Sequence, residues 1–489
     1  MIVGYRSFGR TSLNYGLSLC IEKSNHIHGL QFAEISAASA HSCDVLLFSL
    51  FWWTHFYDYA EFLVKAKVDP RKSIKPLVIL GGFNSFNFRS LGNLFHLACV
   101  GDGEDWLPKA LELAKRNDID GIKMLSGTYW PGKETATQWQ NVKFESYAMN
   151  EPGQTTTRIE IARGCKYSCK FCALTYLKKN REGTEEQIKS LIDASPGKRV
   201  ALFAPDRLSH TNYSALSSHL INAGKIDNAA DTRMDSLNRY TGDYQGTLLF
   251  GMEGVSQRLR KAVGKSMPVD LLVNNLCRIT RESKTGKKNF RFYIILDLPG
   301  EKDEDYDEFT EFLAAIERRP EASRMILSPF INTFMPQPLT PVQWGGIHLF
   351  EDRKAKMARA IWPHGHGHPW RATIAWTPRM WGATSRLKAQ IAIRGDERAE
   401  KVFLNLALNP ILRTLSKQPN NEGAKHLLKF CTKVGLDEQF LCGEFNTTDP
   451  LPWDRIETHV PKHTLIRSWE SYHRQLNQDD RTQLHEKAI

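Results

Sequence analysis

The stretch Arg163-Gly164-Cys165-Lys166-Tyr167-Ser168-Cys169-Lys170-Phe171-Cys172-Ala173 contains three cysteines at Cys-x3-Cys-x2-Cys spacing, directly after the apolar run 159–162. Closely spaced thiolates are the ligands with which a short loop binds an iron–sulfur cluster. A cubane cluster has four irons, so three local ligands leave one iron open to a reactant unless a distant cysteine binds it. The sequence therefore predicts a 4Fe-4S cluster on Cys165, Cys169 and Cys172.

Three other interpretations of these cysteines fit the sequence less well. A structural zinc ion usually takes four ligands from two separated pairs, and no second pair follows at that spacing. Disulfides need an oxidising compartment, whereas the chain begins Met-Ile-Val-Gly-Tyr-Arg, without the charged and apolar regions of a secretory signal. A chance cluster of core thiols disagrees with the polar residues between them, Lys166, Ser168 and Lys170.

Composition indicates a globular protein of two or three domains, since the chain has 489 residues, 41% hydrophobic and 24% charged. The apolar stretch 45–53 is far shorter than the roughly 20 residues that a membrane span needs. The six cysteines outside the motif are scattered singly, as in a reduced cytosol, so we expect a cytoplasmic protein. The net charge of +11 suggests a polyanionic partner.

Residues 1–150 alternate short apolar runs with helical patterns, which predicts a doubly wound parallel sheet followed by a connector. The expected strands begin at Ile2, Asp44, Leu77 and Ala98, and the expected helices cover residues 12–22, 55–67 and about 104–115. The connector, from about residue 121, is rich in Gly, Lys, Thr and Pro.

Residues 151–335 repeat strand and helix signals in about six units, which predicts a partial (β/α)6 barrel of the TIM type with its site at the C-terminal mouth. The cysteine loop follows the first of these strands. The six expected strands cover residues 158–162, 199–204, 232–236, 247–253, 290–297 and 325–330.

The cysteine motif, with Phe171 before its last cysteine, resembles the signature of the radical S-adenosylmethionine (radical SAM) enzymes, whose core is a partial barrel of this kind. The resemblance implies that the methionyl amino and carboxylate groups of S-adenosylmethionine bind the open iron. One electron then cleaves the cofactor to a 5′-deoxyadenosyl radical, which abstracts hydrogen from a substrate. The resemblance also implies that a reductase or a flavodoxin-type protein donates this electron.

The same resemblance suggests which strand ends would bind S-adenosylmethionine. Asp206 would hold the amino group, or else cap a helix. Arg233 would pair with the carboxylate, or Asp235 with ribose hydroxyls, although buried ion pairing between strands competes with both roles. Residues 251–256 resemble the family's Gly-x-Glu-x-x-Ser segment, and residues 298–301 its Leu-Pro-Gly-Glu loop at the adenine edge. The further residues that the resemblance places at the S-adenosylmethionine site are Phe171, Glu253, Ser256, Leu298 and Pro299.

The order of elements before the barrel resembles the cobalamin-binding domain that often precedes a radical SAM core, with Gly81-Gly82 and Gly101-Asp102-Gly103-Glu104 in matching places. The family's Asp-x-His-x-x-Gly segment has no counterpart, because residues 5–9 contain no histidine. Either cobalamin binds without a histidine ligand, or the domain has lost the cofactor. We favour loss on the sequence alone.

Residues 336–489 are expected to form a mixed, largely helical domain that contacts the substrate. Residues 353–395 contain nine Lys or Arg residues and no Asp or Glu, interleaved with tryptophans. Cations beside stacking aromatics are typical of proteins that hold single strands or flipped bases, although such tryptophans also serve as packing anchors. The candidate nucleic-acid contacts are Trp370, Arg371, Trp376, Arg379 and Trp381.

These features predict a radical SAM enzyme that modifies a nucleobase of DNA or RNA or its side group, by rearrangement or by alkyl transfer, as an isomerase or a transferase. One alternative is a cobalamin-dependent methylase of a peptide or small metabolite. Another is a nucleic-acid-binding protein whose iron–sulfur cluster is purely structural.

Overall fold

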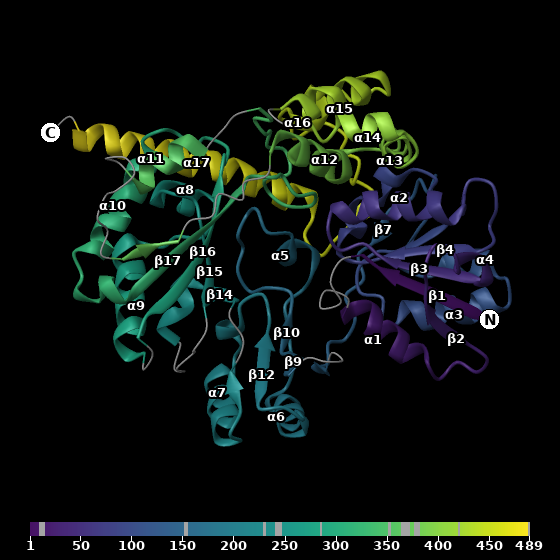
Figure 1. The fold of residues 1–489 in the computed structure, drawn as a ribbon, viewed down its shortest axis with the longest axis horizontal. Helices are drawn as coiled ribbons and strands as arrows, with labels where there is room; N and C mark the ends of the chain where they lie inside the picture. Colours follow the sequence, from purple (N-terminus) through teal and green to yellow (C-terminus); the bar gives the residue numbers. More distant parts are fainter. Residues whose placement is uncertain are drawn as a thin grey trace.

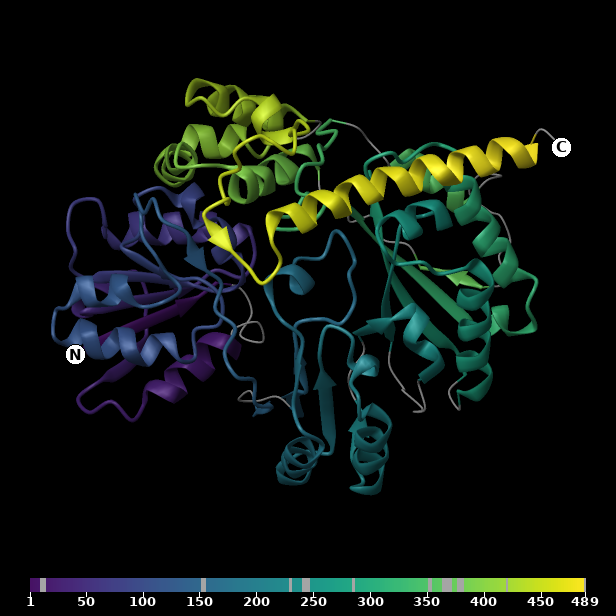
Figure 2. The ribbon, with the colours of Figure 1, turned by 180° about the vertical axis from the view of Figure 1, so that it is seen from behind.

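The computed structural model describes residues 1–8, 15–150, 155–227, 231–239, 247–283, 286–350, 354–362, 372–375, 382–418 and 421–487. The N-terminal sheet and the central barrel-like region lie side by side (Figure 1), and the C-terminal helices run along one edge of both. The view from behind agrees (Figure 2). No helix of the described residues is both long and apolar enough to cross a membrane.

The N-terminal domain is built on a six-stranded sheet of order β2-β1-β3-β4-β5-β6, in which only the short β6 is antiparallel to its neighbour. The elements are β1 Ile2–Ser7, α1 Tyr15–Ser24, β2 Gln31–Glu34, β3 Val45–Ser49, α2 Thr54–Ala66, β4 Leu77–Gly81, β5 Leu97–Cys99, α3 Trp106–Lys115, α4 Ile119–Met124 and β6 Thr128–Tyr129.

The central strand β3 shows why this sheet is buried on both faces. All five of its residues are buried, as expected for a parallel strand covered by helices on both sides. Leu46 and Phe48 pack with α2 on one face, and Val45 and Leu47 pack with α3 on the other. The predicted parallel sheet is confirmed. The edge strand β2 was not predicted, because its four residues are mostly exposed and carry no apolar run.

The central region carries two sheets, of order β13-β12-β9-β8 and β14-β15-β16-β17-β18. Strand β8 is antiparallel to β9, and the other neighbouring strands pair in parallel. The strands are β8 Tyr147–Met149, β9 Thr156–Glu160, β12 Arg199–Phe203, β13 Ile226–Asp227, β14 Asp231–Arg233, β15 Leu248–Glu253, β16 Lys288–Leu296, β17 Met325–Thr333 and β18 Thr373–Ile374. The six predicted strands are all present, but no ladder in the described residues joins the two sheets into one arc. Residues 228–230, between β13 and β14, lie outside the described part.

Helices follow these strands in the expected alternation, and the connector contributes short strands. The helices are α5 Ala173–Leu177, α6 Glu185–Ala194, α7 Tyr213–Asn222, α8 Gln257–Ala262, α9 Val269–Glu282 and α10 Asp305–Glu317, with the 3-10 helices η4 Arg207–Ser209, η5 Met234–Arg239 and η6 Pro320–Arg324. In the connector, β7 Thr137–Gln138 pairs with β19 Ile456–Glu457 near the far end of the chain.

The C-terminal part is helical and covers both preceding regions. Its helices are α11 Lys354–Ile361, α12 Ala383–Arg394, α13 Ala399–Leu408, α14 Pro410–Leu415, α15 Glu422–Lys433, α16 Glu438–Cys442 and α17 Lys462–Lys487. Helix α13 packs on α2, where Phe403 meets the ring of Tyr57 edge to face at 4.9 Å. Asn87 donates to the carbonyls of Ile393 and Gly395 at the end of α12. The long α17 instead crosses the barrel region beside α8 (Figures 1 and 2).

Candidate active site

The three motif cysteines lie on one loop between β10 (Ala162–Arg163) and α5. Gly164 begins this loop with φ +79, and a Cβ there would lie 2.3 Å from the carbonyl oxygen of Lys179, so the turn requires glycine. The Cys172 amide donates to the carbonyl of Cys169 at 3.0 Å, and the Lys170 amide donates to the carbonyl of Val263 at 2.9 Å. Backbone hydrogen bonds therefore hold the second half of the loop.

Two buried cations face Cys169. Arg233, at the end of β14, donates from Nη1 to Cys169 Sγ at 3.0 Å. Lys265, beyond α8, lies close enough to attract negative charge on the same sulfur. Lys265 is also paired with Glu253 at 2.7 Å. The positive charges of Arg233 and Lys265 therefore lie near Cys169, where a thiolate would form.

The donor set fits a cluster better than a single metal ion. Burial raises the pKa of Cys169, and burial together with the neighbouring Cys169 raises that of Cys172 to about 12, so a metal must supply the driving force for deprotonation. No three His, Cys, Asp or Glu side chains in the described residues converge as one metal ion requires. In a 4Fe-4S cluster each thiolate binds a different iron, so the ligands need not converge.

The strand-end carboxylate Asp206 helps to hold β14 in place. It accepts hydrogen bonds from the Arg233 amide at 3.3 Å and from Ser236 Oγ at 2.9 Å, and it is 3% exposed. Its side chain makes no capping bond to η4, which was the alternative role. The Asp235 carboxylate accepts hydrogen bonds from both Nε and Nη2 of Arg233. Asp206 and Arg233, which are buried, and the half-buried Asp235 therefore form one network beside Cys169.

The two predicted residues at and after the end of β15 have different surroundings. Glu253 lies near the cysteines through its ion pair with Lys265, and it adopts a positive φ of 70. A side chain at Gly251 would collide with that ion pair, since an added Cβ would lie 2.6 Å from Lys265 Nζ. Ser256 caps α8 at the Leu259 amide and donates to Asp305 at 2.5 Å. Its hydroxyl is therefore engaged within the protein.

The loop after β16, with Leu298 and Pro299, lies under α17. Tyr472 donates its hydroxyl to the Pro299 carbonyl at 2.7 Å, and Leu476 packs where a side chain at Gly300 would stand. The Tyr472 ring also lies 5.7 Å from the ammonium of Lys170 in the cysteine loop. The C-terminal helix thus contacts both the cysteine loop and the Leu-Pro-Gly-Glu loop. Nothing in the local sequence of α17 indicated this role.

A second feature that the sequence did not predict is a buried ionic node between the N-terminal domain and the cysteine loop. Asp102, after β5, has a side chain only 1% exposed and pairs with Lys178 at 3.0 Å, Arg181 at 2.9 Å and Arg163 at 3.3 Å. Glu104 also pairs with Arg163. Burial opposes ionisation of Asp102, but Lys178, Arg163 and Arg181 lower its pKa to about 2.

Comparison with known proteins identifies the family. A family model described as the Radical SAM superfamily matches residues 159–313, which include the three cysteines and the strand ends described above. These residues belong to the radical SAM superfamily. The predicted family is confirmed, and the protein is a radical SAM enzyme. Membership of this superfamily implies a 4Fe-4S cluster and S-adenosylmethionine.

Two further similarities extend beyond the radical SAM core. An uncharacterised protein of Methanocaldococcus jannaschii, MJ0966, is 23% identical over 347 residues, which are 66% of this chain and 72% of that relative. Two structures of the cobalamin-dependent S-adenosylmethionine radical enzyme OxsB, one with aqua-cobalamin and one with aqua-cobalamin and S-adenosylmethionine, align at 12% identity and a TM-score of 0.48. The alignments cover 100% of this chain and 81% of OxsB.

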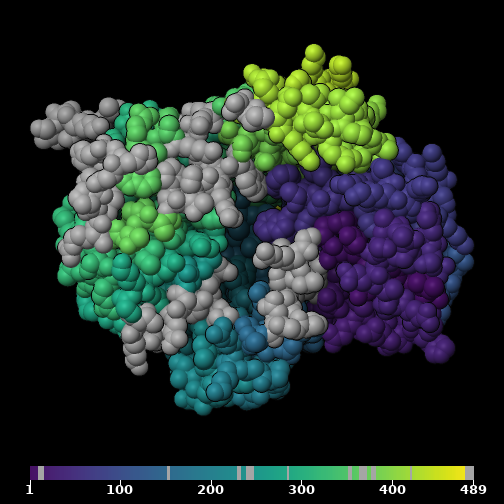
Figure 3. Space-filling view, in the orientation of Figure 1, coloured from purple at the N-terminus to yellow at the C-terminus, as the bar shows by residue number. Residues whose placement is uncertain are grey.

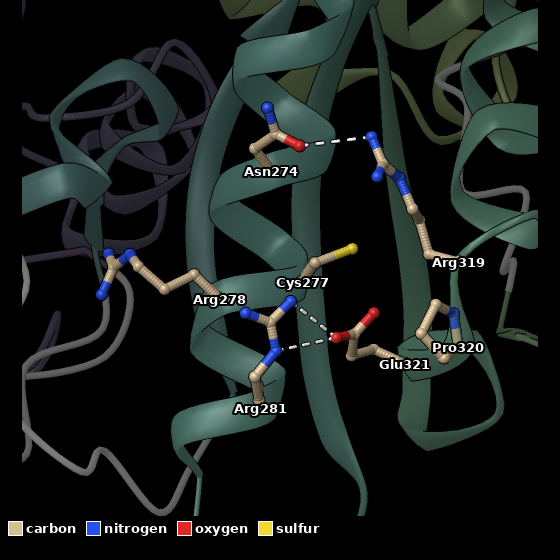
Figure 4. A pocket seen from close by; sticks show the side chains of 7 residues that line it. All are labelled: Asn274, Cys277, Arg278, Arg281, Arg319, Pro320 and Glu321. Atoms are coloured by element: carbon tan, nitrogen blue, oxygen red, sulfur yellow. Dashed lines mark hydrogen bonds and ion pairs between the residues drawn. The ribbon is translucent and has the colours of Figure 1, made fainter.

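One cavity of this radical SAM enzyme lies away from the cysteines, between α9 and η6. It has a volume of about 500 Å³. Its arginines have partners within the protein (Figure 4): Arg281 binds Glu321 at 2.8 Å and Arg319 donates to Asn274 at 3.3 Å. Arg278 points away and donates to the Leu237 carbonyl. We assign no function to it.

The predicted nucleic-acid contacts lie outside the described residues, so the structure gives no position for them. They are Trp370, Arg371, Trp376, Arg379 and Trp381.

Proposed function

We propose that this radical SAM enzyme holds its 4Fe-4S cluster on Cys165, Cys169 and Cys172, and that its N-terminal domain binds cobalamin at the C-terminal edge of its sheet. The bound cluster and S-adenosylmethionine would supply a 5′-deoxyadenosyl radical, and cobalamin would supply a carrier for an alkyl group. The chain's own residues would orient these groups and exclude water. The reaction would be alkyl transfer to, or rearrangement of, a substrate between the two domains.

The observation that carries this proposal is the ionic node at Asp102. Doubly wound sheets bind ligands outside the carboxyl ends of their strands, where the strand order reverses. Here the reversal falls at β1, between β2 and β3. Asp102 follows β5 at the same edge and pairs with Arg163, two residues before the first cysteine. The ligand edge of one domain therefore lies against the cysteine loop of the other, and the surface is hollowed between the two (Figure 3).

Aromatic side chains at this edge suit a large flat ligand. Phe51 and Trp52 follow β3, and Phe83 follows β4, with the Phe51 ring 5.0 Å from Trp52 and 5.7 Å from Phe83. Trp52 is 49% exposed, which is unusual for so large an apolar side chain. A corrin ring that covered Trp52 would remove this apolar surface from water.

Neither histidine near β3 suits cobalt ligation. His55 accepts hydrogen bonds at Nδ1 from the amides of Phe51 and Trp52, so the proton of its neutral ring is on Nε2. Burial lowers its pKa to about 4, which keeps the ring neutral at physiological pH. His41 lies before β3, at the opposite edge of the sheet. We therefore propose that cobalamin binds without either histidine as a ligand.

Cobalamin binding can be measured by titrating the purified protein with hydroxocobalamin and following its absorption. We expect saturable binding that Trp52→Ala weakens by about 1–3 kcal/mol, a typical gain from stacking on an aromatic ring. Trp130→Ala is the matched control, since Trp130 follows β6 at the other edge of the sheet. His41→Gln and His55→Gln should leave the spectrum unchanged. Nitrogen ligation lost in either histidine variant would contradict the assignment, and no corrin binding at all would mean that the domain has lost the cofactor.

A second candidate is that the substrate is a nucleic acid, as the acid-free basic segment 353–395 suggests. Binding should then weaken with salt at a slope of about −0.7 to −0.9 per phosphate contact. Four to six contacts would cost roughly two to three orders of magnitude in affinity between about 50 and 200 mM salt. Arg371→Glu and Arg379→Glu should lower affinity and substrate-dependent turnover, whereas Lys65→Glu on α2 should not. Tight binding of DNA or RNA that neither arginine substitution weakens would contradict the assignment of segment 353–395 as the contact region. No binding of either nucleic acid would favour a peptide or a small metabolite as the substrate.

A further inference from the structure

We infer that Arg233 sets the reduction potential of the cluster by donating a hydrogen bond to Cys169, one of its three ligands. This inference rests on the proposed cluster on Cys165, Cys169 and Cys172. It assigns Arg233 as a positioning and tuning residue, whereas the sequence suggested that it binds the methionyl carboxylate.

The guanidinium of Arg233 has three kinds of contact, and each uses a different part of the group. Nε and Nη2 both donate to the carboxylate of Asp235, at 2.9 and 2.7 Å. Nη1 donates to Cys169 Sγ at 3.0 Å. The planar group lies over the ring of Tyr167, with its central carbon 3.8 Å from the ring centre. The fork that would bind a substrate carboxylate is thus already filled by Asp235.

The surroundings hold this arrangement rigidly. Tyr167 is anchored by a hydrogen bond of 3.0 Å between its hydroxyl and Ser236 Oγ, and Ser236 in turn donates to Asp206. Asp206 also accepts from the Arg233 amide, so backbone and side chain of Arg233 are fixed together. Arg233 is 7% exposed. A donor fixed in this way loses little conformational entropy when the sulfur becomes a stronger acceptor.

A hydrogen bond to a ligand sulfur favours the reduced state of a cluster. Reduction adds negative charge to the irons and their sulfurs, and the potential depends on hydrogen bonds to sulfur, net charge and solvent exposure. A donor held at 3.0 Å from Cys169 Sγ therefore stabilises the reduced cluster more than the oxidised one. Its loss should lower the potential, so that a given electron donor reduces a smaller fraction of the enzyme.

Lys265 offers a matched comparison, since it too is a buried cation near Cys169 and forms a buried ion pair. Its partner is Glu253 at 2.7 Å, as the partner of Arg233 is Asp235. Its ammonium acts on the sulfur through charge. Removing both members of either pair leaves the net charge unchanged. Only removal of the Arg233 pair takes away a hydrogen bond to sulfur.

The test is a redox titration of the reconstituted full-length protein without S-adenosylmethionine, followed by electron paramagnetic resonance. In the double variant Arg233→Met with Asp235→Met, we expect the equilibrium constant for one-electron reduction to fall about tenfold, which is a potential lower by about 59 mV. The double variant Lys265→Met with Glu253→Met should shift the potential much less. Equal potentials in the wild type and the Arg233 variant, or equal shifts in the two double variants, would overturn the inference.

A measurement on the wild type keeps the inference testable if the variants do not assemble a cluster. In protein labelled with 15N-arginine, pulsed electron paramagnetic resonance of the reduced cluster should detect a 15N coupling from the adjacent guanidinium. Its absence would contradict the proposed contact with Cys169. Failure of the wild type to assemble any cluster would instead contradict the proposed function, so the two failures are distinguishable.

Discussion

Replacing any one of Cys165, Cys169 or Cys172 by alanine should abolish the 4Fe-4S cluster and the formation of 5′-deoxyadenosine, while the chain stays folded. Each thiolate anchors one iron, and no other cysteine follows at motif spacing to replace it. The loop is held by backbone contacts, such as that of the Lys170 amide with Val263, which a change of side chain leaves intact. Iron content, an assay of 5′-deoxyadenosine and far-ultraviolet circular dichroism measure the three effects.

The matched controls are alanine variants of Cys277, Cys431 and Cys442. These three cysteines are buried outside the motif loop, in or next to helices α9, α15 and α16, and all nine cysteines of the chain are unpaired. The control variants should keep a full complement of iron, although loss of a buried sulfur costs some stability. If one of them lost the cluster as completely as the motif variants, it would be a fourth ligand, and the open iron would not exist.

Asp102→Ala should produce the second largest effect, a loss of about 3–5 kcal/mol in the free energy of unfolding. The substitution leaves Arg163, Lys178 and Arg181 around a buried site without the carboxylate that compensates them. Because Arg163 adjoins the cysteine loop, we also expect incomplete cluster loading. Urea denaturation of the cluster-free protein and iron content after reconstitution measure these two effects.

The control for Asp102 is Asp118→Ala, also in the N-terminal domain. Asp118 caps α4 through the Gly121 amide at 2.7 Å, so its loss should cost about 1 kcal/mol and leave iron content unchanged.

Stability also depends on pH, since Asp102 has its pKa lowered to about 2. Its contribution is present above the ordinary value near 4 and is lost as the pH falls towards 2. If the free energy of unfolding of Asp102→Ala were no lower than that of Asp118→Ala, the stabilising role of the ionic node would be contradicted.

Local patterns in the sequence were sufficient to predict the family and the parallel sheet. The three cysteines fall within eight residues, so their joint role is visible without a structure. Residues 45–48 of β3 are all apolar because both faces of the strand are covered. The pairing of β13 with β14, by contrast, would depend on long-range contacts that no local pattern specifies, and the described residues form two separate sheets.

The contacts that define the site join residues far apart in the chain. Arg163 and Glu104 are 59 residues apart, and Arg233 and Cys169 are 64 apart. The sequence suggested Arg233 and Asp235 as separate cofactor contacts, with ion pairing as the alternative, but it could not show that Asp235 itself occupies the fork of Arg233. The contact of Tyr472 with Pro299 spans 173 residues, which is why the role of α17 was not predicted.

The measurement that tests the account most directly is 5′-deoxyadenosine formation by the wild-type protein, reconstituted without oxygen, reduced and given S-adenosylmethionine. We predict 5′-deoxyadenosine and methionine in equal amounts, and a change in the spectrum of the reduced cluster when S-adenosylmethionine is added, because the amino and carboxylate groups of S-adenosylmethionine would bind the open iron. A fully loaded cluster whose spectrum S-adenosylmethionine leaves unchanged, with no 5′-deoxyadenosine formed, would contradict the account and leave the cluster a structural one.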